Sequence, residues 1–480
     1  IGTADLDGDG LPDHYGTRGA GGETTLKPVF VAFGEGDIPH LMTSVTKVTG
    51  GTTSIEYLAS SHPDVNSNDQ IPGVRQLLHK VEQSDGRGQT RVTSYQYSGG
   101  KFDWTYRRSL GFAKVTKTLP KLATETSAPT VETSYNNNNL AQAGRATRVA
   151  YSANGVILNE TLTNYSYAFS GNGPMSATPT RLRKVAHEGA AQTTVTTLMG
   201  LDTYGEVVSR RFLGFTDVTG SINHDTSDDL TIYTWYVRDA NKYLMDRVRY
   251  VRQFAHADVT NDLSKWLQED LFYYDGLGGN QIGSGNLTRS FRRIDPTVGG
   301  SYRRLQTNVF DTHGNITQTT DARNAVSTNV YDATRNLFLI QNTNALGHVT
   351  TQTWHTGCQA PAVTTDANAL TTSVTYDAFC REYNRALPDG NYSQTRYHDF
   401  GNPALQRIAT HSPAASGPQS IAWTYFDGLG QTYLSHKSGK TSALADQISV
   451  YTGYDMRGNV AWQSLPHLQP YRSQHIGGAS

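Results

Sequence analysis

The sequence has little charge and no long hydrophobic run. Charged residues make up 17% of the chain, where about 25% is usual, and 41 basic residues nearly balance 42 acidic ones. A formal net charge of -1 gives the chain no overall field to attract nucleic acid or an anionic membrane. No stretch approaches the roughly 18 consecutive apolar residues that a membrane-spanning helix requires. The composition therefore predicts no nucleic-acid partner and no membrane span.

The sequence also lacks the short motifs of common catalytic sites. It contains no Gly-x-Ser-x-Gly elbow, and its 15 histidines include no His-x-x-x-His pair of the kind that binds zinc on a helix. The glycine-rich stretch 276–285 lacks the Lys-Ser/Thr ending of a phosphate-binding loop. We therefore expect a protein that is not an enzyme, with a carboxylate-dependent hydrolase as the enzymatic alternative.

Basic and aromatic residues interleave at Arg247, Arg249, Tyr250 and Arg252. Such a cluster occurs on surfaces that stack nucleic-acid bases. The alternation also fits a strand whose charged side chains face solvent. Because the chain has almost no net charge, we favour the solvated strand.

The chain is rich in the residues of strands and tight turns. It contains 46 Gly and 27 Tyr, and aromatic residues reach 10%. Glycine suits turns, whereas Tyr and Thr favour strands. We therefore expect an all-β fold in which burial depends on aromatic side chains, Val and Leu.

An internal repeat runs through the second half of the chain. An aromatic residue or His is followed by Asp or His, and the second members of five successive pairs are 21, 23, 22 and 22 residues apart. These pairs are Phe310-Asp311, Tyr331-Asp332, Trp354-His355, Tyr376-Asp377 and His398-Asp399, followed at wider spacing by Phe426-Asp427 and Tyr454-Asp455. A second series lies halfway between them, at Asp321, Asn344, Asp366 and Asp389. Each period therefore contains two turns.

The spacing of Asp and Gly identifies these turns. Type I turns favour Asp or Asn at the first position and Gly at the fourth. This spacing occurs in Asp202/Gly205, Asp275/Gly278, Asp311/Gly314, Asn344/Gly347, Asp427/Gly430 and Asp455/Gly458. Each period then predicts an antiparallel hairpin of two short strands, whose Asp residues cap turns and are not catalytic. Outside the array, a short helix or a capped turn fits residues 258–267.

Successive hairpins predict one long strip of antiparallel sheet. Open sheets beyond about ten strands seldom stay flat. The strip must therefore curl to bury its Tyr and Leu face, and a curling strip encloses a space.

The two cysteines, Cys358 and Cys380, occupy equivalent places in adjacent repeats, four residues after Trp354 and Tyr376. Equivalent positions two strands apart are roughly 9 to 10 Å apart, whereas a disulfide needs Cα atoms about 4.4 to 6.8 Å apart. We therefore expect free thiols that replace turn glycines. His355 is attributed to the repeat and not to a catalytic dyad with Cys358.

The stretches Phe310–Asn315 and Tyr454–Asn459 resemble YD (Rhs) repeats. This resemblance implies an antiparallel β-strip that spirals into a hollow shell. In Rhs effectors and in the B and C components of Tc toxins, such a shell holds a toxic C-terminal domain. Residues 271–480 would then form the YD/Rhs array.

An acidic loop lies at the N-terminus. Gly10 permits a sharp bend in this loop, and hard oxygen ligands at this spacing suit Ca²⁺. The candidate ligands are Asp5, Asp7, Asp9, the carbonyl of Leu11, and Asp13. Gly16 replaces the final Glu of an EF-hand, and the loop instead resembles the FG-GAP/VCBS loop of β-propeller blades. It implies a structural Ca²⁺ ion, with a cluster of Asx turns without metal as the alternative.

The region after this loop reads as strands. Residues 41–57 alternate around Gly50-Gly51 as a hairpin does, and strand patterns continue at 91–97 and 106–115. These stretches resemble the middle region of SpvB/TcB-type toxin components. The resemblance implies three regions, namely 1–40 with the calcium loop and the end of a β-propeller, 41–270 as the middle β-region, and 271–480 as the array.

Together these resemblances are to a Tc toxin B-component. They imply a secreted or extracellular bacterial protein, a structural segment of a shell that encapsulates and helps deliver a toxin or effector polypeptide. The implied partners are the remainder of its own polypeptide or a C-component that closes the shell, the enclosed toxin domain, and a translocation pore component. A cell-surface adhesion or carbohydrate-binding module is the alternative. Because the chain begins at Ile1 without Met, we expect a piece of a longer polypeptide.

Overall fold

In the computed structural model, nearly all of the described residues form strands and turns. The structure describes residues 2–18, 27–34, 36, 38, 40–67, 70–168, 175–189, 191–216, 228–255, 266–295, 300–413, 419–438 and 447–469. In these residues the helical structure is limited to the 3-10 turn η1 (Ala240–Lys242). None of the described segments forms a helix long and apolar enough to cross a bilayer. The all-β prediction is confirmed.

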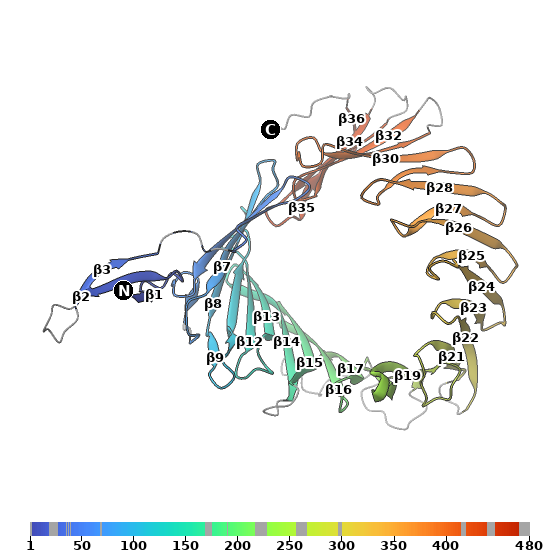
Figure 1. Cartoon of the computed structure of the whole chain (residues 1–480), viewed down its shortest axis with the longest axis horizontal. Coiled ribbons are helices and arrows are strands. Elements are labelled where there is room, and N and C mark those ends of the chain that lie inside the picture. The colour runs from blue at the N-terminus through green and yellow to red at the C-terminus, as the bar shows by residue number, and fades with distance from the viewer. Residues whose placement is uncertain are drawn as a thin grey trace.

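The N-terminal residues form a small separate sheet. Its strands are β1 (Gly2–Ala4), β2 (Asp13–Arg18) and β3 (Lys27–Ala32), paired antiparallel in the order β1-β2-β3. This sheet projects from the rest of the molecule as an arm (Figure 1). The acidic loop lies between β1 and β2.

The middle region supplies the first strands of the large sheet. The predicted hairpin around Gly50-Gly51 is present, with Ser44 opposite Ser54. The strands of this region are β4 (Ser44–Thr46), β5 (Thr52–Ala59), β6 (Asn66–Ser67), β7 (Gln76–Ser84), β8 (Thr90–Ser98), β9 (Lys101–Asp103), β10 (Arg108–Gly111), β11 (Lys114–Thr118), β12 (Thr130–Asn136), β13 (Arg145–Ala153), β14 (Val156–Ala168), β15 (Ser176–Glu188), β16 (Ala191–Leu201), β17 (Val207–Thr216), β18 (Leu230–Asp239) and β19 (Leu244–Ala255). β9 and β10 form a two-stranded sheet of their own.

The second half continues the same sheet as regular hairpins. Of the residues predicted as a short helix or capped turn, 258–265 lie outside the described residues, and the last two begin β20. The strands are β20 (Trp266–Tyr274), β21 (Leu287–Arg293), β22 (Tyr302–Phe310), β23 (Ile316–Asp321), β24 (Val326–Tyr331), β25 (Leu339–Thr343), β26 (Val349–His355), β27 (Ala360–Thr365), β28 (Thr371–Tyr376), β29 (Glu382–Ala386), β30 (Tyr392–His398), β31 (Arg407–Ser412), β32 (Ser420–Phe426), β33 (Thr432–Ser438), β34 (Gln447–Tyr454), β35 (Val460–Gln463) and β36 (His467–Gln469).

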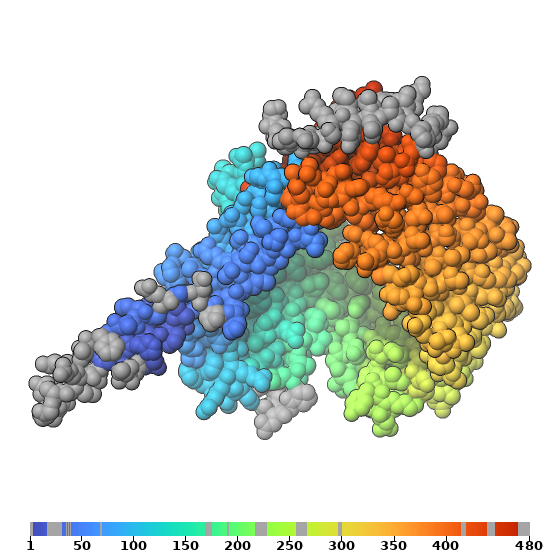
Figure 2. All heavy atoms as spheres, turned by 45° about the horizontal axis from the view of Figure 1, so that its top comes forward, coloured from blue at the N-terminus to red at the C-terminus, as the bar shows by residue number. Residues whose placement is uncertain are grey.

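The strip curls into a ring. From β11 to β34 each strand pairs antiparallel with the next, and Figure 1 shows the strands following one another around an open centre. The sheet closes on itself. Figure 2 shows that side chains do not fill this centre, because the green far wall is visible between the blue and orange walls. The predicted curled strip around a space is confirmed.

Burial in this wall is local. Buried apolar residues form separate small clusters along the strip, of which one joins Trp423, Tyr425 and Leu434, and another joins Phe254 and Trp266. A single curved layer has no central core, so each group of neighbouring strands must stabilise itself through side chains on its own faces.

The antiparallel order places the turns on two edges of the strip. Edge A is defined by turns 311–315, 332–338, 355–359, 377–381, 399–406, 427–431 and 455–459. Edge B is defined by turns 47–51, 85–89, 119–129, 321–325, 344–348, 366–370 and 387–391. The contacts that close the ring join these two edges.

Candidate functional site: the seam that closes the ring

The Asp residues of the array cap the turns, as predicted. The Oδ1 atom of Asp311 accepts hydrogen bonds from the backbone N–H groups of His313 and Asn315, at 2.8 and 2.9 Å. The first and fifth turn residues also pair, because the Asp311 N–H donates to the Asn315 carbonyl at 2.9 Å. The Asn315 side chain and these bonds hold the pKa of Asp311 below its usual value. The same bonds to the third and fifth residues recur at Asp85, Asp202, Asp321, Asn344, Asp366, Asp377, Asp427 and Asp455.

One predicted turn is wrong. Asp275 and Gly278 do not form a four-residue turn, because Asp275 itself has a positive φ of 54°. Its Oδ2 atom accepts from the N–H groups of Gly283 at 2.7 Å and Gly285 at 2.9 Å. Asp275 therefore caps a longer loop, 275–286, which the simple spacing rule does not represent.

In three of the pairs the aromatic side chain hydrogen-bonds a neighbouring hairpin. The Tyr376 hydroxyl donates to the carbonyl of Pro361 at 2.7 Å, and Tyr454 donates to Thr432 at 2.8 Å. In the copy with Trp354, the indole N–H donates to the Leu339 carbonyl at 2.8 Å. Burial raises the pKa of the Tyr454 hydroxyl, which keeps it protonated as a donor. The repeat thus supplies a cap and a link in adjacent residues.

The seam joins the beginning of the strip to its end. The Gly51 N–H donates to the Gly428 carbonyl at 3.1 Å, and the Gly428 N–H donates to the Asp85 carbonyl at 2.6 Å. Edge B of the first hairpins therefore contacts edge A of the last ones. A Cβ atom on Gly51 would lie 2.1 Å from the Gly428 carbonyl oxygen, so this approach requires glycine.

Gln406 is the buried centre of the seam. Its side chain is 0% exposed. Its amide nitrogen lies 2.8 Å from the Thr49 carbonyl and 2.8 Å from the Asp427 carbonyl. One side chain therefore satisfies backbone groups on both sides of the seam. Burial raises the pKa of Asp427 beside it.

Charged and aromatic contacts flank this centre. The guanidinium of Arg87 lies 3.5 Å from the centroid of the Tyr433 ring, a distance at which a cation is attracted to the ring face. Farther along, Arg457 hydrogen-bonds Glu125 and donates to the Pro120 carbonyl at 3.0 Å. The bond from Arg457 holds the pKa of Glu125 below its usual value. These partners are more than 300 residues apart in sequence, so the seam joins the two ends of the strip through long-range contacts.

The acidic loop brings together three of its four predicted carboxylates. Ligand atoms of Asp5, Asp7 and Asp13 lie within 4.8 Å of one another. Asp13 is fully buried, and the Gly34 N–H, which donates to it at 2.8 Å, is the main cause of its lowered pKa. Asp9 lies outside this group, and its Oδ1 accepts from the Leu11 N–H at 2.7 Å. The three grouped carboxylates offer the hard oxygen ligands that suit Ca²⁺.

Two carboxylates on the strands share one arginine. Glu132 and Glu160 both bind Arg148, at 3.0 and 2.5 Å. Lys114 extends the row on one side at 3.2 Å, and His187 extends it on the other at 3.3 Å. The row is an ion-pair ladder across β11 to β15. A charge-neutralised ladder of this kind stabilises the sheet and gives no support to the hydrolase alternative.

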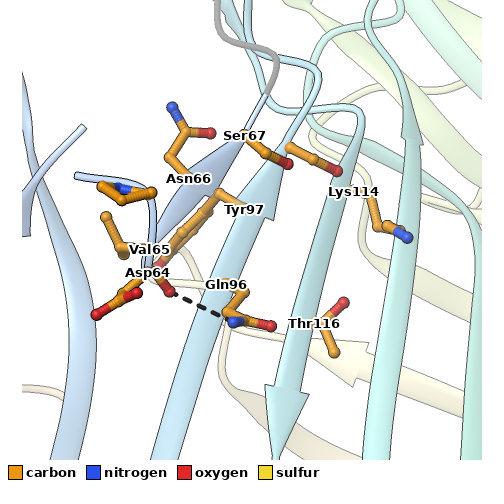
Figure 3. A pocket seen from close by; sticks show the side chains of 10 residues that line it. Asp64, Val65, Asn66, Ser67, Gln96, Tyr97, Lys114 and Thr116 are labelled. Carbon is orange, nitrogen blue, oxygen red and sulfur yellow. Dashed lines mark hydrogen bonds between the residues drawn. The ribbon is translucent and has the colours of Figure 1, made fainter. Parts of the chain in front are cut away.

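A polar cleft of about 200 Å³ lies where β6, β8 and β11 meet (Figure 3). Its lining includes one carboxylate, from Asp64, and one ammonium group, from Lys114. The Gln96 amide donates to the Asp64 backbone carbonyl at 3.3 Å, and burial raises the pKa of Tyr97 to about 12. The lining contains a single carboxylate, so the cleft does not supply the paired carboxylates of the hydrolase alternative.

The cluster predicted as a solvated strand lies on β19, but one of its members, Arg252, is packed among other side chains. The Arg252 guanidinium pairs with buried Glu269 at 2.6 Å and lies 4.6 Å from the Trp266 ring and 4.7 Å from the Tyr250 ring. The prediction assumed that the Arg252 guanidinium would be exposed to solvent. It instead forms an ion pair with the buried carboxylate of Glu269 on the next strand, β20.

The prediction of free thiols is wrong. Cys358 and Cys380 form a disulfide, with Cα atoms 5.3 Å apart. The expected distance applied strand spacing to residues that lie beyond the last paired residues of β26/β27 and β28/β29. Outside the ladder nothing fixes neighbouring turns at strand spacing, so the two turns converge.

Comparisons with known proteins agree with this architecture. Residues 1–143 match the family described as the insecticide toxin TcdB middle/N-terminal region. No curated protein matches the chain by sequence. The crystal structure of TcdB2-TccC3 superposes with a TM-score of 0.69 at 11% identity, over 88% of this chain and 31% of that chain. The Photorhabdus luminescens Tc holotoxin pore gives 0.71 at 11% identity, over 98% of this chain and 35% of that one.

This chain spans about a third of the length of the structures it matches. At such identity the structural likeness establishes the fold. The names YD/Rhs and FG-GAP, and the boundaries of the three predicted regions, remain predictions. The resemblance to a Tc toxin B-component is confirmed, by the family match of the first 143 residues and by the shared fold of nearly the whole chain.

Proposed function

We propose that this chain is a structural wall segment of a hollow shell that encapsulates a toxin or effector polypeptide and helps to deliver it. The observation that carries the proposal is the hollow ring closed by the seam around Gln406 (Figure 2). A wall acts by exclusion and needs no reactive group. Its function then depends on how well it stays closed.

The chemistry of the wall suits this task. Backbone hydrogen bonds join neighbouring strands from β11 to β34, while Asp caps and Tyr hydroxyls satisfy backbone groups where the strands end. A wall of paired strands offers enclosed polypeptide few free backbone groups to pair with. The enclosed chain is thereby kept from contact with the outside.

The partners follow from the same proposal. They are the remainder of the same polypeptide or a C-component that completes the shell, the enclosed toxin domain, and a translocation pore component. The matched structures support this set, because one is the structure of TcdB2-TccC3 and another is that of a Tc holotoxin pore. We also propose a secreted or extracellular bacterial location, where such a shell would act.

The direct test is to image the natural assembly that contains this chain by electron cryo-microscopy and to digest it with protease. We expect polypeptide density inside the ring and protection of the enclosed segment. The variant Gln406→Ala should lose protection, whereas Gln463→Ala, at an exposed position, should keep it. An empty ring in the assembly, or digestion of the cargo at the same rate inside and outside it, would refute encapsulation.

A cell-surface adhesion or carbohydrate-binding module is the second candidate. Exposed aromatic side chains favour it, since Tyr243 is 90% and Trp104 71% exposed, and such rings stack on sugars or on partner proteins. The two functions separate in one experiment, because an adhesin binds immobilised glycans through these rings without any enclosed cargo. Glycan binding that is lost in Trp104→Ala and Tyr243→Ala would support this candidate.

We also propose that the acidic loop binds a structural Ca²⁺ ion. Asp5, Asp7 and Asp13 would supply carboxylate oxygens, with Asp9 and the Leu11 carbonyl as the remaining predicted ligands. The ion would offset the repulsion between clustered carboxylates and fix the arm.

Calorimetric titration of the full chain with Ca²⁺ tests this site. We expect one bound ion, lost in Asp7→Asn and retained in Asp64→Asn, whose side chain is 74% exposed. Absence of binding to the unaltered chain would favour the alternative of Asx turns without metal.

A further inference from the structure

The disulfide joins two turns that lie beyond the last paired residues of β27 and β28, Val363 and Ser373. Cys358 lies in turn 355–359 and Cys380 in turn 377–381, both on edge A. Between these turns the chain runs through β27 and β28 and back to the same edge. The Sγ–Sγ bond therefore ties successive hairpins together at their tips, beyond the last ladder hydrogen bond.

The position of Cys380 explains how the bridge can form. It is the fourth residue of the turn that begins at Asp377, and its φ is 61°. Gly314, Gly430 and Gly458 occupy the same place in other edge-A turns, with φ between 87° and 89°. A residue at this place without a side chain cannot reach the next turn. Cysteine here accepts an unfavourable backbone conformation and gains a covalent partner.

The bond is accessible at the rim. Cys380 is exposed and Cys358 is half-buried, and the neighbouring Phe379 is 79% exposed. His355 and Arg381 lie on the same two turns. The Cys358 N–H donates to the His355 ring at 3.1 Å, and Arg381 pairs with Asp377 at 2.7 Å. A dissolved thiol can therefore approach the sulfur atoms without unfolding the wall.

We propose that Cys358–Cys380 is a reducible clasp on the shell wall, closed in an oxidising compartment and opened by thiols such as those of a reducing cytosol. In the opening step, one reductant thiolate attacks a cysteine sulfur and the Sγ–Sγ bond breaks, giving a mixed disulfide. A second reductant thiol displaces the remaining cysteine. Two electrons and two protons pass to the protein, which gains two thiols, and the reductant leaves as its own disulfide. Opening frees the tips of both hairpins.

The first test concerns the state of the bond. The full chain, recovered from an oxidising medium, is unfolded in the presence of N-ethylmaleimide and weighed intact. We expect no adduct, but two adducts after the folded chain has been treated with dithiothreitol. Two adducts without reductant, or none after treatment of the folded chain, would overturn the clasp.

The second test measures what the bond does. Hydrogen exchange of peptides that cover 349–386 should accelerate by about tenfold or more on reduction, because the bond restrains two turns that extend beyond the paired residues of β27 and β28. Peptides from β12 to β14 serve as the internal control and should not change. The double variant Cys358→Ser/Cys380→Ser should exchange at the fast rate with or without reductant. Unchanged exchange of 349–386 in the reduced natural chain would refute the clasp whether or not the variant folds, and neither test involves a cargo.

Discussion

The wall of the array and the seam both join hairpins, but they do so in different ways. In the wall, neighbouring strands are joined by a backbone ladder, the same Asp cap recurs from turn to turn, and an aromatic link is added at Trp354, Tyr376 and Tyr454. At the seam, a few unlike contacts around Gln406, Gly51 and Arg87 each occur once. A structure built on repetition tolerates the loss of one contact, whereas one built on single contacts does not. Single substitutions should therefore weaken the seam far more than the wall.

The largest effect is expected from Gln406→Ala. The substitution leaves carbonyls on both sides of the seam buried without a donor, and we expect a loss of about 3 kcal/mol in the free energy of unfolding. Urea denaturation of the full chain measures it, with Gln463→Ala as the exposed control. Equal urea midpoints for the two variants would show that the seam contributes no more than the surface does.

A somewhat smaller effect is expected from Gly51→Ala. The new methyl group would lie 2.1 Å from a backbone oxygen, so the two edges must move apart, at a cost of about 2 kcal/mol. Gly357→Ala is the matched control, because its Cβ would meet only the His355 ring at 3.5 Å. If both variants unfold at the same urea concentration, the close approach of the edges is not needed for stability.

Removal of one link in the wall should cost less. Tyr376→Phe deletes the hydrogen bond to the Pro361 carbonyl and keeps the ring, for an expected loss of about 1 kcal/mol. Tyr383→Phe is the control, since the Tyr383 ring is contacted by Arg396 and would be retained. A loss as large as that of Gln406→Ala would contradict the tolerance ascribed to the wall.

The smallest effect concerns the caps. The folded-state pKa of Asp311 is lowered, so its ionised form stabilises the fold above the unfolded pKa of about 3.9. This contribution is lost as the pH falls through the folded pKa. Asp311→Asn keeps the acceptor, as Asn344 does in its own turn, and removes the titration. We expect its urea midpoint to fall slightly less than that of the unaltered chain between pH 6 and pH 3. An identical pH dependence would show that the cap does not titrate with folding.

The wall could be predicted from the sequence because its chemistry is local. An Asp or Asn with a Gly three positions later forms a turn at every predicted place except Asp275/Gly278, and the regular spacing of these turns specifies the strip. The predictions of the Asp275 turn and of the free cysteines were wrong because neither depends on neighbouring residues alone. The Asp275 carboxylate accepts hydrogen bonds from backbone groups up to 11 positions away. The cysteines lie in turns outside the ladder, where the strand spacing used for the prediction does not apply.

The candidate site was not predictable in the same way. The local sequence around Gln406 or Gly51 does not indicate that the two segments meet, because their contact depends on the summed curvature of all the strands between them. The prediction that Arg252 faces solvent was wrong for a related reason, because its partner Glu269 lies on another strand. For the acidic loop, the spacing predicted a group of four carboxylates, and the structure groups Asp5, Asp7 and Asp13 but not Asp9.

The seam also governs the order in which this molecule can be made. Gln406 and Thr49 are 357 positions apart, and long-range contacts of this kind form late and slowly. On the ribosome, the first hairpins must wait with one rim uncovered until several hundred more residues have been synthesised. During that delay the uncovered edge of the first hairpins can associate with another chain. A nascent chain of this fold therefore needs protection from self-association until its last hairpins have been synthesised.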